Sequence, residues 1–143
     1  MSKQTVFIDV ILPLSLPNLF TYRLPNELRD DIQIGQRAVV PFGKGGKLYS
    51  ALVKRIHNTP PSEYQAKYVE SLLDDQPIVN KNQLKHWDWI ADYYIANPGD
   101  VFNAALPGAL KLASETKILL NSEYDRTTIE ELSNNEFLIF EAL

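Results

Sequence analysis

The first sixty or so residues contain four short apolar runs, and each run is followed by proline. The runs cover residues 6–12, 19–24, 37–40 and 48–56, and the prolines after them are Pro13, Pro25, Pro41 and the pair Pro60-Pro61. β-Branched and aromatic side chains favour strands, whereas proline has no N–H for a sheet hydrogen bond. Short strands with short connections pair in antiparallel fashion. We therefore expect a small, mostly antiparallel β-sheet or an open barrel, with residues 68–73 as a weaker element that fits either strand or helix.

The apolar period changes after Asn80, which is a good helix N-cap and has Gln83 three residues later in a capping-box pattern. The apolar positions that then recur at helical spacing are Leu84, Trp87, Ile90, Ala91 and Tyr94. This pattern predicts an amphipathic helix that ends near residues 97–99. Its aromatic residues Trp87, Trp89, Tyr93 and Tyr94 are interpreted as packing residues, and Asp88 and Asp92 as solvated charges on one face.

A second, shorter helix is predicted from Asp100, as its N-cap, through Ala105. Leu106-Pro107-Gly108 ends it and marks the expected boundary between a domain at 1–108 and another at 109–143. In the second domain, residues 116–120 resemble a strand and 133–136 a capping box. The apolar face of that last helix leads us to expect a piece of a longer protein. The predicted class is α+β.

The charges are divided unevenly along the chain, although the formal net charge is only −4. No acidic residue lies between Asp31 and Glu63, a stretch that contains Arg37, Lys44, Lys47, Lys54 and Arg55. From Glu115 onward acidic residues dominate. Two units with different electrostatic roles are therefore expected.

Composition excludes several kinds of chemistry. The chain has no cysteine and two histidines, so disulfides, thiolate nucleophiles and cysteine-based metal sites are absent, and a metal site is not expected. Its Asp, Glu and His residues form no recognisable catalytic or metal-spaced set. No apolar window approaches the roughly 18 residues of a membrane-spanning helix, and the start of the chain lacks a signal-peptide pattern, so we expect a cytoplasmic protein.

The cluster Gly43-Lys44-Gly45-Gly46-Lys47 is not a nucleotide-hydrolysing phosphate loop. Such a loop has four residues between its glycines, a Ser or Thr after the lysine, and a helix next, whereas here a strand run follows Lys47. Two interpretations remain open. The cluster is either a flexible hairpin turn, or a loop that lets a backbone approach a ligand while Lys44 and Lys47 steer phosphate.

Four aromatic residues lie in or beside the predicted sheet: Phe20, Tyr22, Phe42 and Tyr49. Aromatic side chains interleaved with lysines are typical of surfaces that bind single-stranded nucleic acid. Aromatic residues in strands are, however, more often core residues, and alternation allows only some of the four to face solvent.

An ordered series of segments resembles the N-terminal part of the primosomal protein N′ (PriA) family of replication-restart DNA helicases. The segments are VILPLSLPNLFTYRLP, IGQRAVVPFGKGGKLYSALV, LLDDQPIV, WIADYY and NPGDVFNAALPGALK, and the resemblance covers residues 6–111. From Ala113 onward only the placement is similar, and it corresponds to the truncated start of a winged-helix domain.

The resemblance implies a module that binds the 3′ end of DNA. It implies that Phe20 stacks on the terminal base, that Gly43 brings the backbone against the terminal nucleotide, and that Lys67 supplies a cation or donor to it. Family members often carry aspartate after the phenylalanine, as an acceptor for the 3′-hydroxyl, whereas this chain has Thr21. A threonine hydroxyl also accepts hydrogen bonds but carries no charge. Lys44 and Lys47 match no family role and stay candidates for phosphate contacts.

The family implies a larger function than this chain carries. It predicts binding of the nascent leading strand and of branched DNA at stalled or abandoned forks, within an ATP-dependent 3′-to-5′ helicase that assembles the primosome with other proteins. ATP and zinc are expected only in the remainder of such a protein, since this chain has neither a Walker loop nor cysteine and should be catalytically silent. The alternative is a non-enzymatic docking domain that contacts other domains of its parent protein.

Overall fold

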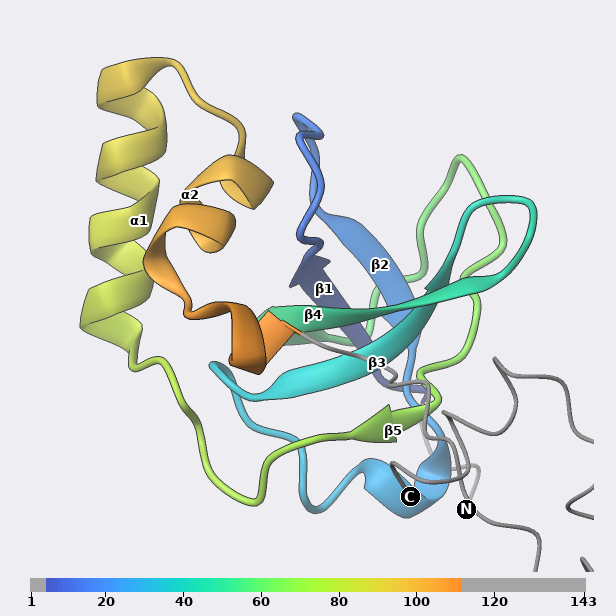
Figure 1. The fold of residues 1–143 in the computed structure, drawn as a ribbon. Coiled ribbons are helices and arrows are strands. Elements are labelled where there is room, and N and C mark those ends of the chain that lie inside the picture. The colour runs from blue at the N-terminus through green and yellow to red at the C-terminus, as the bar shows by residue number, and fades with distance from the viewer. Residues whose placement is uncertain (1–4, 112–143) are drawn as a thin grey trace, which may run out of the picture.

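The structure is a computed structural model and describes residues 5–111. The elements, in chain order, are β1 (Phe7–Ile11), β2 (Phe20–Arg23), the short helix η1 (Asn26–Leu28), β3 (Arg37–Phe42), β4 (Lys47–His57), β5 (Ser71–Leu72), α1 (Lys81–Tyr94), α2 (Pro98–Ala105) and the short helix η2 (Gly108–Lys111). Figure 1 shows a curled sheet with both α-helices on one side. The α+β class and the antiparallel sheet predicted from the sequence are confirmed. The predictions for 116–120 and 133–136 lie outside the described residues.

The sheet has the strand order β2-β1-β4-β3-β5, and all neighbouring strands are antiparallel. The long strand β4 serves both halves: residues 47–52 pair with β3, and residues 52–57 pair with β1. Leu52, where the two pairings meet, is fully buried. A register shift at Asp9/Val10 marks a bulge in the β1–β4 ladder, which increases local twist.

The segment at 67–70 connects the two edges of the curled sheet. The Arg23 N–H donates to the Lys67 carbonyl at 2.8 Å, and the Val69 N–H donates to the Arg23 carbonyl at 3.0 Å. The next residue, Glu70, donates its N–H to the Val39 carbonyl at 2.9 Å. One short segment therefore bonds to β2 at one edge and to β3 near the other.

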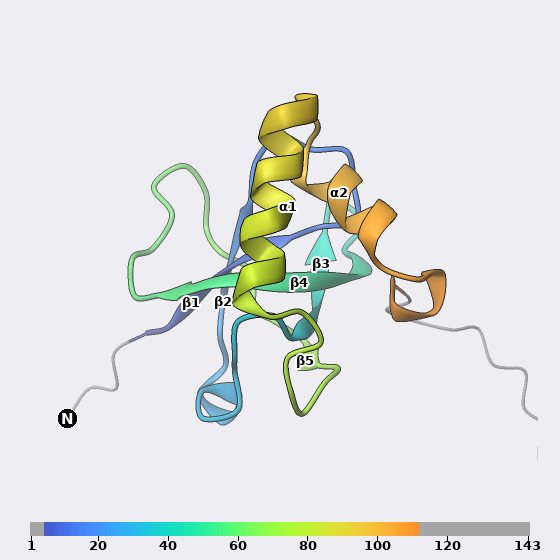
Figure 2. The same cartoon turned by 90° about the vertical axis from the view of Figure 1, so that its left-hand side faces the viewer.

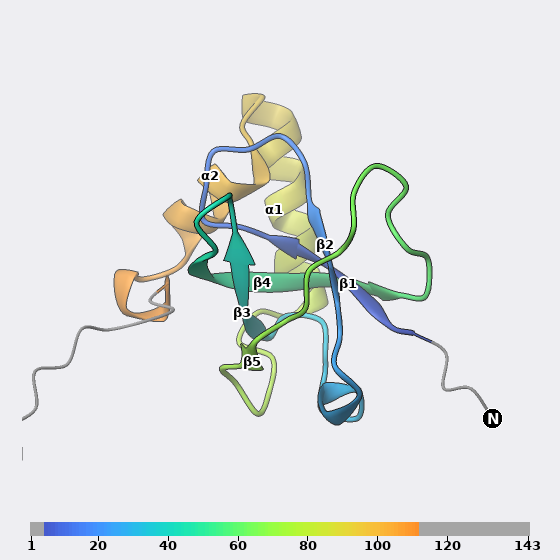
Figure 3. The same ribbon diagram turned by 90° about the vertical axis from the view of Figure 1, so that its right-hand side faces the viewer.

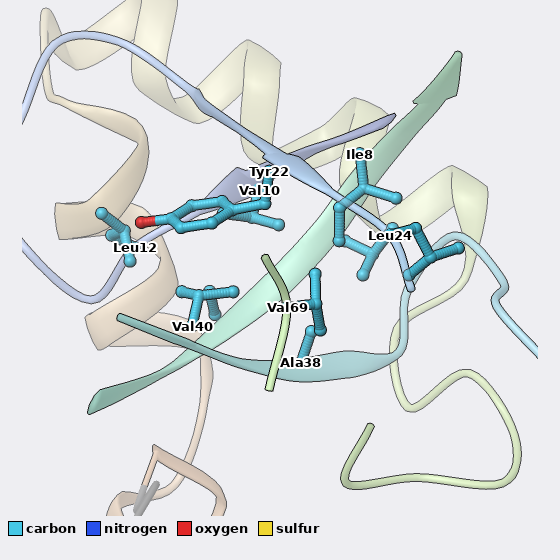
Figure 4. Packing of buried hydrophobic residues seen from close by; sticks show 10 residues of the cluster. Ile8, Val10, Leu12, Tyr22, Leu24, Ala38, Val40 and Val69 are labelled. Atoms are coloured by element: carbon cyan, nitrogen blue, oxygen red, sulfur yellow. The ribbon is translucent and has the colours of Figure 1, made fainter. Parts of the chain in front are cut away.

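Two apolar clusters occupy the two faces of the sheet. The inner cluster fills the concave side with small and β-branched side chains and Tyr22, as Figure 4 shows for Ile8, Val10 and Val40. The outer cluster lies between the sheet and the helices, where Leu52 packs with Trp87 and Phe102. Figure 2 shows α1 crossing in front of β4.

Strand β3 extends to Phe42, beyond the predicted end at Val40. We expected it to end before Pro41, but Pro41 pairs with Leu48 and Phe42 with Lys47. On its other side β3 pairs with β5 only at Ala38 and Val39, so no neighbouring strand there needs an N–H from Pro41. The weak element predicted at 68–73 is a strand, β5.

The predicted capping box of α1 is confirmed: the Gln83 N–H donates to Asn80 Oδ1 at 2.9 Å, and the Asn80 N–H donates to Gln83 Oε1 at 2.8 Å. The packing role predicted for its aromatic residues is correct for Trp87, which is 9% exposed. It is wrong for Trp89, Tyr93 and Tyr94, which are 55%, 66% and 69% exposed. Within residues 5–111 the helices form a single layer, so α1 has a partner on one face only.

Two smaller predictions about acidic residues also change. Asp100 is not the N-cap of α2, because the N-cap is Asn97. The helix begins at Pro98, whose fixed φ suits the first helical position. Asp100 Oδ2 accepts the N–H of Asn97 at 3.2 Å. Asp88 is not simply solvated, because its carboxylate forms an ion pair with Lys54 of β4.

No helix in the described range 5–111 has the length and apolarity to cross a membrane.

A partly buried ion pair joins β3 to the segment after β5. Arg37 Nη2 lies 2.6 Å from Asp74 Oδ1, and the Arg37 N–H donates to Asp74 Oδ2 at 2.8 Å. Arg37 Nη1 also donates to the Leu110 carbonyl at 2.9 Å. Burial by itself would raise the pKa of Asp74, but the hydrogen bonds from Arg37 outweigh it and hold that pKa below its usual value.

Replacing Asp74 with asparagine should lower the free energy of unfolding by about 3 kcal/mol, since it leaves the guanidinium of Arg37 without its counter-charge. Because the folded pKa of Asp74 is lowered, its stabilising effect is present above the unfolded value of about 4 and is lost as the pH falls through the folded pKa. Denaturant unfolding of the D74N variant from pH 7 to pH 2 should therefore show a weaker acid dependence. The exposed neighbour Asp75, changed to asparagine, is the control; an equal effect of both substitutions would contradict the prediction.

Candidate nucleic-acid interface

The curl of the sheet brings the edge strand β2 against the end of β3. The Tyr22 hydroxyl donates to the Pro41 carbonyl at 3.1 Å. The rings of Phe20 and Phe42 meet edge to face, with centroids 4.9 Å apart. β2 and β3 are not neighbours in the sheet, so these contacts close one end of the curl.

A pocket of about 430 Å³ opens at this end. Its walls come from β2, from the end of β3 with the β3–β4 turn, and from the segment at 64–67. The lining residues are Phe20, Thr21, Tyr22, Pro41, Phe42, Gly43, Lys44, Tyr64, Gln65 and Lys67. The lining is mostly apolar, with two lysines and no carboxylate. Figure 3 views the molecule from the side that carries the β3–β4 turn, away from α1.

The structure brings five of the six sequence-predicted site residues together in this pocket: Phe20, Thr21, Gly43, Lys44 and Lys67. Lys47 is the exception. It lies outside the pocket lining, and its Nζ sits 5.3 Å from the centroid of the Tyr49 ring in a cation–π contact. The two lysines of the turn are therefore not equivalent in position.

Gly43 and Gly46 shape the turn between β3 and β4. Both have positive φ, +77° and +63°, a conformation that L side chains rarely adopt. The Gly46 N–H donates to the Gly43 carbonyl at 3.3 Å, and Lys67 Nζ donates to the same carbonyl at 3.0 Å. A Cβ at Gly43 would meet no atom within 4 Å, so only the backbone conformation, not crowding, favours glycine in the free protein.

Thr21 is held by two hydrogen bonds that it donates. Its N–H donates to the hydroxyl oxygen of Tyr64 at 2.8 Å, and its side-chain hydroxyl donates to Asp9 Oδ1 at 2.6 Å. Asp9 lies directly opposite Thr21 in the β1–β2 ladder. The side chain of Asp9 is only 15% exposed and also lies 3.0 Å from His57 Nε2.

The four aromatic residues of the sheet all pack in or against the inner cluster, and all but Tyr49 also line the pocket. Tyr22 is buried, 4% exposed, and burial, together with the nearby Tyr64, raises the pKa of its hydroxyl to about 12. Phe20 and Phe42 are half-buried at the pocket, and Tyr49 packs edge to face on Phe42 with centroids 6.2 Å apart. Phe20 and Tyr22 lie two residues apart on β2 and face the same side of the sheet, so their position along the strand, and not alternation, leaves Phe20 more exposed than Tyr22.

Sequence reasoning missed Tyr64 and Gln65, which line the pocket, and Asp9, which does not line it but accepts a hydrogen bond from Thr21. Tyr64 stands in a polar stretch after Pro60-Pro61, and an aromatic residue in such a loop is itself a signal of a binding role. Asp9 lies inside an apolar strand, where a carboxylate is unusual and indicates a specific partner. In residues 5–111 no three side chains from His, Asp and Glu gather in a way that could hold a metal ion.

The geometry suits a nucleotide better than a small apolar molecule. Half-buried rings offer a surface for a base, and the two ammonium groups offer counter-charge to phosphate. A family model described as the 3′DNA-binding domain (3′BD) of PriA matches residues 9–107. The chain belongs to this family. The 3′BD family comprises DNA-binding domains, and the pocket lies entirely inside the matched region.

Curated relatives support the assignment to the PriA 3′BD family. The Replication restart protein PriA of Bacillus subtilis is 30% identical over 115 residues, which cover 78% of this chain. The protein of the same name from Haemophilus influenzae is 33% identical over 107 residues, or 73% of this chain. In both cases the match covers 14% of the relative, so the chain spans a small part of the length of these proteins.

Proposed function

We propose that this 3′BD binds the terminal nucleotide of a DNA strand that ends in a 3′-hydroxyl, with the pocket around Phe20 as the binding site. The observation that carries the proposal is the convergence of residues from three separate parts of the chain. Phe20 comes from β2, Gly43 from the β3–β4 turn and Lys67 from the segment before β5, and all three line one pocket.

Each lining group has a chemical role in the proposed complex. The ring of Phe20 stacks on the terminal base, a contact that tolerates any base because every base has a π-face. Lys67 uses one of its three donors on the Gly43 carbonyl and keeps two for the nucleotide. Lys44, exposed at the rim, attracts a backbone phosphate. Thr21 lies at the edge of the pocket, and its own hydroxyl is bonded to Asp9.

In the wider setting, the domain would deliver a larger protein to the nascent leading strand at a stalled or abandoned fork. This wider role is supported by the name of the relatives, Replication restart protein PriA. The similarity covers only 14% of the length of each relative. We infer that helicase activity, ATP, zinc and contacts with other primosome proteins belong to the remaining length of such a protein. The domain itself would act in the cytoplasm as a non-enzymatic binding module.

The exposed aromatic residues of α1 favour a second candidate function, docking to another domain. The rings of Trp89 and Tyr93 stack with centroids 5.1 Å apart, and the ring of Tyr94 contacts that of Tyr93 at 4.9 Å. Contiguous exposed apolar side chains often mark protein–protein contacts. α1 and the β3–β4 turn lie on different sides of the molecule, so the two candidate functions need different surfaces (Figure 1).

Replacing Phe20 with leucine tests the stacking role while it keeps an apolar side chain against the inner cluster. The variant should lose about 1–3 kcal/mol of binding free energy for a single-stranded oligonucleotide with a free 3′ end, because leucine has no π-face. Fluorescence anisotropy measures the affinity, and thermal unfolding measures the fold. Tyr93 changed to leucine is the control, since its ring is exposed on α1. An F20L variant that keeps both its stability and full affinity would refute the stacking role.

Gly43 and Gly46, the two glycines of the turn with positive φ, form a matched pair. Changing either Gly43 or Gly46 to alanine should cost about 1–2 kcal/mol of stability, because both have positive φ. Only Gly43 lines the pocket, so only G43A should also weaken DNA binding, by about tenfold or ~1.4 kcal/mol. Equal affinities of the two variants would show that close backbone approach at Gly43 is not part of binding.

Salt dependence separates DNA binding from docking. If the domain binds phosphates, the affinity for single-stranded DNA should fall as salt rises, with a log–log slope of about −0.7 for each phosphate contacted. K44Q should make the slope less steep by about one contact, whereas K47Q, outside the pocket lining, should change it less. Failure of the wild-type domain to bind DNA even at low salt would instead favour docking through α1.

A further inference from the structure

A second, smaller cavity of about 140 Å³ lies at the other end of β2 from Phe20. Ligand pockets for drug-sized molecules measure about 300–1,000 Å³, so this cavity suits a single small group. Its described lining contains two arginines and no carboxylate, a set that favours an anionic group. The described residues that line it are Thr5, Arg23, Leu24, Asn26, Arg29 and Tyr68.

Arg23 is held at this cavity by aromatic rings and not by an acid. Its guanidinium carbon lies 5.7 Å from the centroid of the Phe7 ring and 5.4 Å from that of the Tyr68 ring, within the range of cation–π contacts. Its Nη1 donates to the Tyr68 hydroxyl oxygen at 3.3 Å. Within residues 5–111 it forms no ion pair with a carboxylate, and its buried Nε has no hydrogen-bond partner. The guanidinium therefore keeps its charge and most of its five donors for a ligand.

The segment at 64–68 follows the outer edge of β2 and contributes to both cavities. Tyr64 and Lys67 line the larger pocket, whereas Tyr68 lines the smaller one. The Arg23 N–H donates to the Lys67 carbonyl at 2.8 Å, so the segment lies beside β2 at this point. Tyr64 and Tyr68 are 45% and 53% exposed. Exposed aromatic rings next to cations are typical of surfaces that bind single-stranded DNA.

We propose that Arg23 and the cavity beside Tyr68 bind a backbone phosphate of the same DNA strand whose end occupies the pocket around Phe20. This inference rests on the proposed function. Phe20 and Arg23 are three residues apart on β2, or about 10 Å along the strand. A stacked DNA strand advances about 3.4 Å per nucleotide, so it reaches Arg23 within about three nucleotides of its end. The strand then leaves the pocket along the segment at 64–68 and not along the β3–β4 turn, where Lys47 lies outside the pocket lining.

The experiment replaces the phosphates of a single-stranded oligonucleotide, one at a time from its 3′ end, with uncharged methylphosphonates. For the wild-type chain, one such replacement within about four nucleotides of the end should weaken binding about tenfold, as expected for a hydrogen bond assisted by charge. R23Q should bind the unmodified strand about tenfold more weakly. In R23Q the same replacement should cost less than about twofold, because that phosphate has already lost its partner. Fluorescence anisotropy measures each affinity.

R55Q is the matched control. Arg55 is exposed on β4 and lines neither cavity, and its replacement changes the net charge by the same amount as R23Q. It should leave the cost of every methylphosphonate unchanged. F20L should weaken all oligonucleotides of the series about equally, because it removes stacking and no phosphate contact. If R23Q unfolds, R23K takes its place: it keeps the charge but loses the planar fork, so the cost of the critical replacement should still fall.

The outcomes distinguish this inference from the proposed function. If F20L binds every oligonucleotide as tightly as the wild-type chain does, the pocket around Phe20 is not the binding site and the proposed function fails. If F20L weakens binding but no single phosphate stands out in the wild-type series, the proposed function stands and the phosphate site at Arg23 is overturned. The same conclusion follows if the critical replacement costs as much in the Arg23 variant as in the wild type, or if R55Q has the same effect as R23Q.

Discussion

Strand β4 is the element on which the rest of the fold depends, because it pairs with two different strands along its length. Its N-terminal half bonds to β3 and its C-terminal half to β1, with the fully buried Leu52 at the crossover. A single strand that serves two partners in this way has to bend, and the bulge opposite Asp9 and Val10 adds twist. The bend turns the sheet into a half-closed curl, and the inner cluster fills its concave side.

The pocket is a consequence of that curl. β2 and β3 are separated by two strands in the sheet, yet Tyr22 bonds to Pro41 and Phe20 meets Phe42. The segment at 67–70 closes the gap between the edges and places Lys67 on the Gly43 carbonyl. The site therefore stands on a framework of backbone hydrogen bonds, which keeps its groups in place before a ligand arrives.

The pairing of β1 with β2 fixes the surroundings of Thr21 at the edge of the sheet. Its backbone position follows from β1–β2 pairing, and the same pairing puts Asp9 beside its hydroxyl.

The sequence by itself determined the elements and half of the residues that line the pocket. Proline breakers, strand and helix periods and the Asn80 capping box are local signals, so strands, helices and the turn could be predicted from them. The family resemblance predicted Phe20, Thr21, Gly43 and Lys67 as site residues. Their charge alone predicted Lys44, which lines the pocket, and Lys47, which does not. Only the tertiary structure decided that Tyr64 and Gln65 line the pocket and that Trp89 is exposed. Those facts depend on how far the sheet curls and on how many layers cover it, and such long-range packing leaves no periodic mark in the chain.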